Sequence, residues 1–330
     1  MSKIKLLSTG GTIAGKGTNS FDFVNYKSGT LSIDEIMDKI SGLDEMVSID
    51  SKQLVNIASS TISLNDWLYL KKEVEEAVLD DNIKGIVITH GTGTMEETAY
   101  FLNLTVNTKK PIVLVGAQRP ITSISSDAPI NLVHAILVAN DKNSVGRGVL
   151  IVMNGKILDA RNVSKTDTYQ LETFQSNNSG YLGIIRPDYK VEYYMKPEKK
   201  HTFKSDFISI SANNTIPDVS IIYSHAGASG ELIDLIVENQ LSKGIILAGT
   251  GGGHGSFEQI DSLLNAIENN IIVVRSTRCS QGIVIPAAKR KWLDFITSNS
   301  LSPQKSRILL MLALTKTTNN EEIQHYFDSH

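Results

Sequence analysis

The sequence predicts an α/β protein in which a larger N-terminal domain, with a mostly parallel sheet flanked by helices, precedes a smaller C-terminal α/β domain. Two observations carry this prediction. Short apolar runs rich in β-branched residues alternate along the chain with segments of helical periodicity, a pattern typical of parallel sheets covered by helices. The chain has 330 residues, enough for two domains with separate cores, although one large α/β domain would also accommodate them.

The elements of the N-terminal domain follow in a regular order. Strands are expected at Ile4–Ser8, Ser48–Ile57, Gly85–Ile88, Pro111–Val115 and Gly148–Met153. Helices are expected at Leu31–Ile40, Asp66–Leu79 and Pro129–Asn140, with another beginning after Thr94. The helix at 66–79 places its apolar residues on one face, so it should cover a sheet. Thr94, followed three residues later by Glu97, predicts a capping box at the start of its helix.

The domain limits are set by a change in composition. We expect the first domain at residues 1–193, a linker at 194–215 and the second domain at 216–330, because Met195–His201 is charged and lacks periodicity. The glycine-rich stretch Gly249–Gly255 lacks the Walker lysine and the Rossmann spacing, so it indicates a strand-to-helix turn. In the second domain we expect strands at Val219–Tyr223, Gly244–Leu247 and Ile271–Val274, and helices at Gly230–Asn239, Phe257–Asn269, Ala287–Asn299 and Gln304–Thr315.

Composition excludes several classes of function. A formal net charge of -3 gives no electrostatic footprint for nucleic acid or an anionic membrane. The single cysteine, Cys279, excludes an intramolecular disulfide and is typical of a small buried residue. The seven histidines lack a paired metal-ligand spacing, and no GxSxG elbow anchors a serine triad. No signal-peptide core follows Met1 and no segment could span a membrane, so we expect a cytoplasmic protein.

Two expected strands end in turns rich in glycine and hydroxyl groups, at Thr9–Gly15 and Thr89–Thr94. Open α/β sheets place their chemistry at the carboxyl ends of parallel strands. A threonine nucleophile needs a neighbouring base, and Lys165 could serve if burial lowers its pKa. The aperiodic loop Lys16–Thr30, which carries Tyr26, could close over such a site. Each feature also has a plain structural interpretation, as a turn glycine, a solvated lysine or a surface aromatic.

The segments Leu7–Gly15 and Gly85–Thr98 resemble the two signature motifs of the bacterial-type L-asparaginase/glutaminase family, whose members are threonine amidohydrolases. The similarity continues in colinear order through Val115–Pro120, Asp159–Thr166 and Leu301–Arg307. The resemblance implies hydrolysis of a small-molecule amide in amino acid metabolism, with no cofactor or metal. It also implies a homotetramer of close dimers, in which each site is completed by the second domain of a neighbouring subunit.

The resemblance also implies catalytic roles for residues of the first domain. Thr12 matches the nucleophile, and Tyr26 matches the lid-loop tyrosine beside it. Thr92 and Lys165 match the second threonine and the lysine of the family's proton-relay group. Backbone N–H groups near Thr12, Thr92 and Ala117 would stabilise the oxyanion that forms during acyl transfer.

Several substrate-binding positions depart from the family pattern, whereas Ser59 matches the serine that helps hold the α-carboxylate. Gly93 stands where the family motif HGTDT has an aspartate that contacts the substrate α-ammonium group and the lysine. Ser60 replaces a glutamine. Gly252 replaces an asparagine and Lys289 falls near a glutamate, both of which the neighbouring subunit contributes. The residues that cleave the amide therefore persist, whereas those that recognise the amino acid do not.

These departures predict a change in substrate. Losing one charge-assisted hydrogen bond costs about 1.5–3 kcal/mol, so a free α-ammonium group would bind poorly. We expect an amide other than free L-asparagine, either lacking the α-ammonium group or carrying it acylated, and Lys289 would favour an additional anion. Two alternatives stay open: an L-asparaginase, including an inactivated or engineered variant altered at Gly93, and a catalytically silent protein that binds small molecules.

Overall fold

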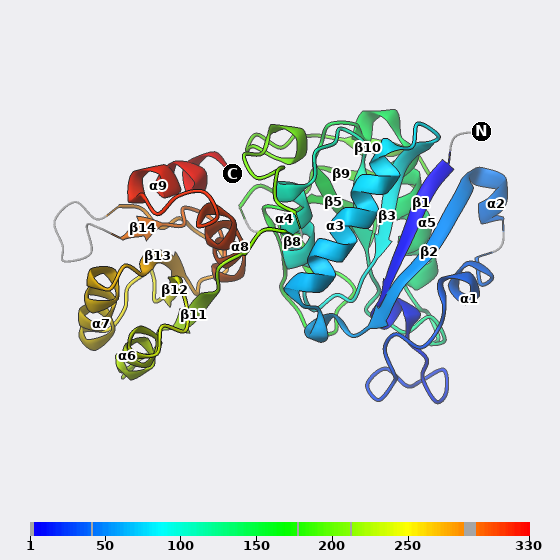
Figure 1. The fold of residues 1–330 in the computed structure, drawn as a ribbon. Coiled ribbons are helices and arrows are strands. Elements are labelled where there is room, and N and C mark those ends of the chain that lie inside the picture. The colour runs from blue at the N-terminus through cyan, green and yellow to red at the C-terminus, as the bar shows by residue number, and fades with distance from the viewer. Residues whose placement is uncertain (1–2, 41, 177, 212, 287–294) are drawn as a thin grey trace. The chain divides into compact units, whose positions relative to one another are not determined.

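The computed structural model describes residues 3–40, 42–176, 178–211, 213–286 and 295–330 (Figure 1). The chain divides into a first unit, Met1–Ile208, and a second unit, Ser209–His330. The first contains a large, mainly parallel sheet with helices, and the second contains a separate smaller sheet with helices. The predicted fold class is thereby confirmed.

The first unit is built on a sheet that, in the described part of the chain, has eight strands in the order β10-β9-β6-β5-β4-β3-β1-β2. The strands from β2 to β5 are parallel, whereas β5, β6, β9 and β10 pair antiparallel. A separate hairpin joins β7 to β8. The bounds are β1 Lys3–Gly10, β2 Ser48–Ile57, β3 Ile83–Thr89, β4 Ile112–Val115, β5 Val149–Met153, β6 Lys156–Asp159, β7 Val163–Lys165, β8 Phe174–Ser176, β9 Gly183–Ile185 and β10 Val191–Tyr193.

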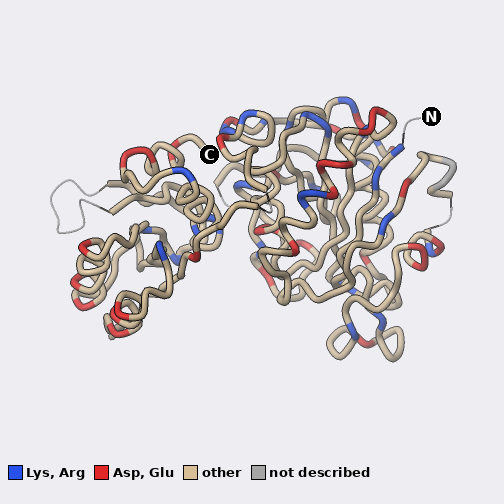
Figure 2. The backbone as a smooth tube through the Cα atoms, viewed as in Figure 1, with Lys and Arg blue, Asp and Glu red and all other residues tan. Residues whose placement is uncertain are grey.

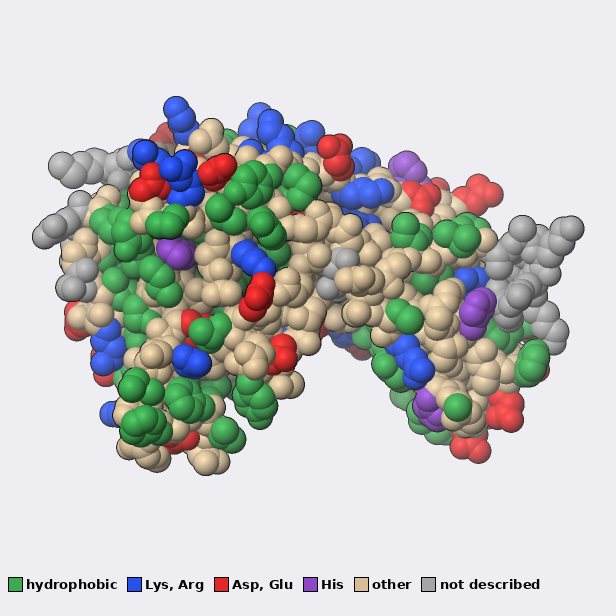
Figure 3. Space-filling model, turned by 180° about the vertical axis from the view of Figure 1, so that it is seen from behind, with side chains coloured by type: hydrophobic (Ala, Val, Ile, Leu, Met, Phe, Trp, Pro, Cys, Tyr) green, Lys and Arg blue, Asp and Glu red, His purple; other side chains and the backbone are tan. Residues whose placement is uncertain are grey.

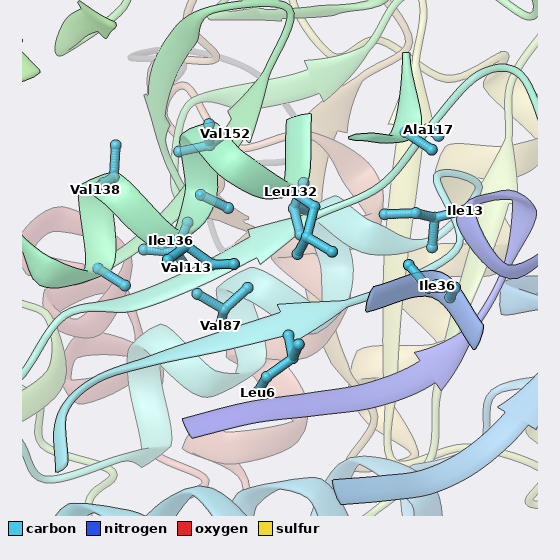
Figure 4. Packing of buried hydrophobic residues seen from close by; sticks show 14 of the residues in the cluster. Leu6, Ile13, Ile36, Val87, Val113, Ala117, Leu132, Ile136, Val138 and Val152 are labelled. Atoms are coloured by element: carbon cyan, nitrogen blue, oxygen red, sulfur yellow. The ribbon is translucent and has the colours of Figure 1, made fainter. Parts of the chain in front are cut away.

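Helices cover this sheet on both faces, with α3 in front of it and α5 behind it in Figure 1. Figure 4 shows how Leu132 and Ile136 of α5 pack over Val87 and Val113 of the sheet, forming part of the buried core. The helices are α1 Ile33–Met37, α2 Leu43–Met46, α3 Leu64–Leu79, α4 Met95–Thr105 and α5 Ala128–Asn140, with 3-10 turns at Thr12–Ala14, Ser59–Thr61, Lys142–Ser144 and Thr202–Lys204.

The predicted capping box before α4 is wrong. Thr94 occupies the N-cap position, but its side chain makes no capping hydrogen bond. Its Oγ1 instead donates to the carbonyl oxygen of Ser59 at 2.8 Å. The hydroxyl therefore ties the turn to a neighbouring segment, a long-range partner that the local spacing could not reveal.

The second unit has, among its described residues, a parallel sheet in the order β11-β12-β13-β14. Its core lies between the sheet and the packed pair α6 and α7. The turn at 249–255 joins β12 to α7, as predicted. The bounds are β11 Val219–Tyr223, β12 Gly244–Gly249, β13 Ile272–Thr277, β14 Ile296–Thr297, α6 Glu231–Glu238, α7 Phe257–Glu268, α8 Pro303–Ala313 and α9 Asn320–Ser329.

Two predictions for the second unit need correction. Much of the helix expected at 287–299 lies outside the described residues, but Ile296 and Thr297 form strand β14, so the prediction is wrong there. Both residues are buried and pair with β13. A strand of two residues is too short to give a periodic signal in the sequence. Cys279 is exposed rather than buried, because it lies in the loop after β13, where its N–H donates to Thr277 Oγ1 at 3.0 Å.

The expected linker includes residues that pack onto the first unit. Phe207 is fully buried, and Ser205 Oγ donates to the carbonyl oxygen of Leu104 on α4 at 2.5 Å. The domain limits 1–193, 194–215 and 216–330 stay a prediction. Each helix among the described residues is too short or too polar to cross a bilayer.

Candidate active site

The site lies where two neighbouring strands end. Strands β1 and β3 are adjacent and parallel, so the loops that follow them share one edge of the sheet. The two loops touch at Gly11 and Gly91, since a Cβ on Gly11 would lie 2.3 Å from Gly91 Cα. Gly11 also has φ +84°, which favours glycine. Thr12 and Thr92 each follow one of these glycines, so this contact brings both threonines to the same edge.

We expect Gly11→Ala to lower the free energy of unfolding by about 3 kcal/mol or more, because its methyl group meets backbone that cannot rotate away. Urea denaturation measures this change. Gly155→Ala is the matched control, because Gly155 has φ +71° but no neighbouring atom within 4 Å. Its cost should be about 1–2 kcal/mol, from the left-handed conformation alone. Equal losses in the two variants would contradict close contact between the loops.

Thr12 is nearly buried, and its Oγ1 lies 2.7 Å from the hydroxyl oxygen of Tyr26. The loop that carries Tyr26 is closed at its base by two backbone hydrogen bonds between Lys16 and Lys27. The ring of Tyr26 packs on Gly15, where a Cβ would lie 2.9 Å from ring atom Cδ2. Tyr26 is therefore positioned against the candidate nucleophile rather than resting on the surface as an isolated aromatic.

A second polar group forms around Thr92. Lys165 Nζ, from β7, donates to Thr92 Oγ1 at 2.8 Å and to Gln118 Oε1 at 3.3 Å. Thr92 Oγ1 in turn donates to the same Gln118 oxygen at 3.2 Å. Burial lowers the pKa of Lys165, while the carboxylate of Asp167 acts in the opposite direction. A lowered pKa enlarges the neutral fraction of the amine, which is the form that can accept a proton.

Gln118 is a site residue that the sequence reasoning missed. Its side chain joins Thr92 to Lys165, and its Nε2 donates to the carbonyl oxygen of Gln170 at 3.1 Å. Asp127 Oδ2 accepts a hydrogen bond from the backbone N–H of Gln118 at 3.0 Å, which fixes the backbone at Gln118. The available signal was its place directly after Ala117, at the end of a buried strand.

The candidate substrate-binding residues of the first unit lie on three neighbouring turns, those that follow β2, β3 and β4. Gly93 N–H donates to Ser59 Oγ at 3.1 Å. Ser60, next to Ser59 in the 3-10 turn, is exposed. Ala117 is buried beside Thr92, because a Cβ on the preceding Gly116 would lie 3.0 Å from Thr92 Cγ2. The structure therefore brings these four candidates to one part of the first unit.

Two candidates belong to the second half of the chain. Gly252 is exposed in the turn between β12 and α7, and its carbonyl oxygen accepts a hydrogen bond from Arg275 Nη2 at 3.3 Å. Lys289 lies outside the described residues. Their contribution to a neighbouring subunit's site stays a prediction.

Two family models of known proteins match most of the chain. Residues 3–199 match the family model described as Asparaginase, N-terminal, and residues 218–327 match Glutaminase/Asparaginase C-terminal domain. The chain belongs to the asparaginase family. It is 40% identical over 327 residues to L-asparaginase 2 of Bacillus subtilis, covering 99% of this chain and 86% of that one. It is 42% identical over 330 residues to L-asparaginase 2 of Escherichia coli, covering 99% and 93%.

A solved asparaginase structure agrees with the sequence comparison. The crystal structure of a probable cytoplasmic L-asparaginase from Campylobacter jejuni superposes with a TM-score of 0.94 at 38% identity, covering 100% of both chains. Membership of the asparaginase family makes this chain an amidohydrolase that acts on amides.

His90, in the same turn as Thr92, has a structural role in this asparaginase fold. It is fully buried, with Nδ1 2.7 Å from the Gly91 carbonyl oxygen and Nε2 2.9 Å from Thr98 Oγ1. Burial lowers the pKa of His90 to about 4, so the ring stays neutral near pH 7. Among the residues that the structure describes, His, Cys, Asp and Glu form no group of three or more that could bind a metal ion.

Proposed function

We propose that this asparaginase-family chain hydrolyses a carboxamide through Thr12, on a substrate that lacks a free α-ammonium group. The observation that carries the proposal is the contrast between the two parts of the site. Thr12 with Tyr26, and Thr92 with Lys165, form close polar pairs. At position 93, where the family motif has a carboxylate, the chain offers only its backbone, which is bonded to Ser59.

The first half of the reaction uses the Thr12 hydroxyl. Its oxygen attacks the amide carbon, the carbon–nitrogen bond breaks, and the nitrogen leaves as ammonia after receiving the hydroxyl proton. Tyr26, 2.7 Å away, is placed to carry this proton. Backbone N–H groups near Thr12, Thr92 and Ala117 stabilise the oxyanion. Water then attacks the ester carbon, which releases the carboxylic acid and returns a proton to Thr12.

The second polar pair supports proton movement in this reaction. Burial lowers the pKa of Lys165, so more of its amine is neutral than in a solvated lysine. The neutral amine can accept the proton of Thr92 once this hydroxyl turns from Gln118 toward Nζ, which lies 2.8 Å away, and Thr92 can then activate the attacking water. Gln118 holds both groups in place through one oxygen.

The hydrogen-bonding groups at Ser59 and Gly93 favour a substrate carboxylate over a substrate ammonium group. Ser59 Oγ accepts the Gly93 N–H, so the hydroxyl proton of Ser59 stays available to donate to a substrate carboxylate. An ammonium group would need an acceptor at position 93, and leaving it unpaired costs about 1–3 kcal/mol or more. An ω-amide of a dicarboxylic acid without the amino group meets both conditions, as does an N-acylated amino acid amide.

We expect Gly93→Asp to raise the rate of asparagine hydrolysis by less than about 10-fold, because Ser60, Gly252 and Lys289 still differ from the family pattern. A Cβ at position 93 would lie 3.0 Å from Ser59 Oγ, so the new side chain fits once that hydroxyl rotates. Ammonia release from L-asparagine measures the effect. Gly93→Asn is the matched control, since it adds the same volume without the charge. Full asparaginase activity in Gly93→Asp alone would identify an asparaginase inactivated at this position.

L-asparaginase activity is the second candidate function. The relatives named above favour it, and a further relative from Pseudomonas fluorescens, 36% identical, is named glutaminase-asparaginase. The test uses three ω-amides that differ only at the α-carbon: L-asparagine, N-acetyl-L-asparagine and succinamate. Faster ammonia release from either of the last two supports the proposal, whereas asparagine as the preferred substrate supports the second candidate.

We also propose that the chain assembles as a homotetramer. Figure 3 shows hydrophobic side chains at the surface, and exposed apolar residues occur in both units, among them Phe21, Val24, Leu232, Leu241 and Phe257. Such side chains are typical of surfaces that other subunits cover. Light scattering should give the mass of four chains of 36.1 kDa each, whereas an active monomer would contradict the proposal.

We further propose a cytoplasmic location. The solved structure from Campylobacter jejuni is that of a probable cytoplasmic L-asparaginase, whereas a 43% identical relative from Haemophilus influenzae is named probable periplasmic L-asparaginase. Cell fractionation with compartment markers separates these two locations, and recovery of the protein in the periplasm would overturn this proposal.

A further inference from the structure

A cleft of about 440 Å³ lies in the first unit, apart from the active-site residues. Its walls come from the end of α4, the turn that follows β6, and the chain after β10. Small-molecule sites in proteins usually have volumes of about 300–1,000 Å³, so the cleft is large enough for a small ligand. None of the candidate catalytic or substrate-binding residues lines it, and the function proposed above leaves it unused.

Charge is the main chemical feature of this cleft. Its described lining includes three lysines and two arginines against two carboxylates, although the whole chain has a net charge of -3. Figure 2 shows basic residues on the loop that follows β10. The charged lining residues are Arg147, Arg161, Lys196, Lys199, Lys200, Asp159 and Glu198.

One of the two carboxylates is already committed to the protein itself. Asp159 is 4% exposed, and its Oδ1 accepts hydrogen bonds from the N–H groups of Arg161 and Asn162 at 3.1 and 3.0 Å. The Asn162 side-chain amide donates to the same oxygen at 3.1 Å. These bonds stabilise the turn, whereas the carboxylate keeps its negative charge and offsets part of the cationic field. The cationic side chains of the described lining still outnumber its two carboxylates.

Asn103, a buried residue of the lining, offers the cleft hydrogen-bond donors rather than an acceptor. Its Oδ1 accepts the Val149 N–H at 2.9 Å, so its amide group retains the two N–H donors of Nδ2. Asn103 is 6% exposed, and Gly148 lets it pack closely, since a Cβ there would lie 2.6 Å from Asn103 Oδ1. Burial lowers the pKa of His201, the other buried polar residue at this end, so this part of the lining is neutral.

We propose that this cleft binds a small multivalent oxyanion, either a phosphate or a dicarboxylate. Lys200 is paired with Asp206 at 2.8 Å, and Arg147 donates to two backbone carbonyl oxygens. The exposed Lys196 on the rim and the net positive charge of the lining therefore supply the attraction. The Asn103 amide supplies a fixed neutral donor, a combination that oxyanions accept and cations do not. The turn at 159–162 continues directly into β7, which ends at Lys165. An anion bound at Arg161 is therefore four positions along the chain from Lys165, the proposed catalytic amine.

Isothermal titration calorimetry of the full-length protein tests the site, with inorganic phosphate and malonate as separate probes. We expect saturable binding of at least one probe with a Kd of about 1 mM or lower. Lys196→Glu reverses a charge on the exposed rim and should weaken that binding at least about 10-fold. Lys72→Glu, on the exposed face of α3 and outside the cleft, is the matched control and should leave the Kd unchanged.

Each outcome of this titration bears on the cleft. Tighter binding of phosphate or of malonate identifies which anion the site prefers. Absence of saturable binding by both probes overturns the proposal. Equal weakening by Lys196→Glu and Lys72→Glu indicates a general charge effect and also overturns it, as does binding that Lys196→Glu leaves unchanged. The proposed amide hydrolysis has its own readout, ammonia release, so the failure of one inference is distinct from the failure of the other.

Discussion

Replacement of Thr12 with alanine should lower kcat for amide hydrolysis by at least about 1000-fold, because no other group can form the covalent ester at this position. KM should change little, since the substrate contacts at Ser59 and Gly93 remain. Thr12 Oγ1 lies 2.7 Å from the hydroxyl oxygen of Tyr26, the proposed proton carrier, at the carboxyl edge of the sheet. Steady-state ammonia release on the best substrate of the amide panel measures the loss.

Two further variants separate chemistry from folding in this experiment. Thr12→Ser keeps the hydroxyl and should retain measurable turnover, whereas Tyr26→Phe keeps the ring and should lose about 100-fold or more in kcat. Thermal unfolding of all three variants checks that they fold. Thr12→Ala with unaltered hydrolytic activity would remove the nucleophile assignment.

Replacement of Lys165 with methionine should lower kcat by about 100- to 10,000-fold, because it removes the amine that we propose as the base facing Thr92. The wild-type profile of kcat/KM should rise with pH, since only the neutral amine accepts a proton. Burial places the Lys165 pKa below the ordinary lysine value of 10.5, so this rise should occur below that pH.

Asp167→Asn provides the control for the Lys165 assignment. The Asp167 carboxylate raises the pKa of Lys165, so removing its charge should move the rising limb of the profile to lower pH. The maximal kcat should stay close to that of the wild type. A limb that does not move in Asp167→Asn, or that persists in Lys165→Met, would mean that another group controls the profile.

The parallel strands could be predicted from the sequence because each is a continuous buried apolar run, as in β3 and β4. The strands β9 and β10 of the large sheet have three residues each, as does β8 of the separate hairpin, too few for a periodic signal, so these antiparallel strands were missed. Helix α9 was also missed, since Ile323 and Phe327 are its buried residues and the rest of its sequence is polar.

Only part of the candidate site could likewise be predicted from the sequence. Thr12, Thr92 and Lys165 could be proposed from the sequence, because their residue types and their order along the chain match the family motifs. The role of Gln118 depends on two contacts across the fold, to residues 26 and 47 positions away, which no local pattern encodes. Thr94 likewise bonds to a segment 35 residues away instead of capping its own helix.

The ratio of kcat/KM for succinamate to kcat/KM for L-asparagine tests the central claim most directly. The two substrates share the amide and the carboxylate and differ only in the α-ammonium group, for which position 93 provides no carboxylate. One missing charge-assisted hydrogen bond corresponds to about 10- to 100-fold, so we expect the ratio to favour succinamate by at least about 10-fold. A ratio that favours L-asparagine by a similar factor would contradict the account.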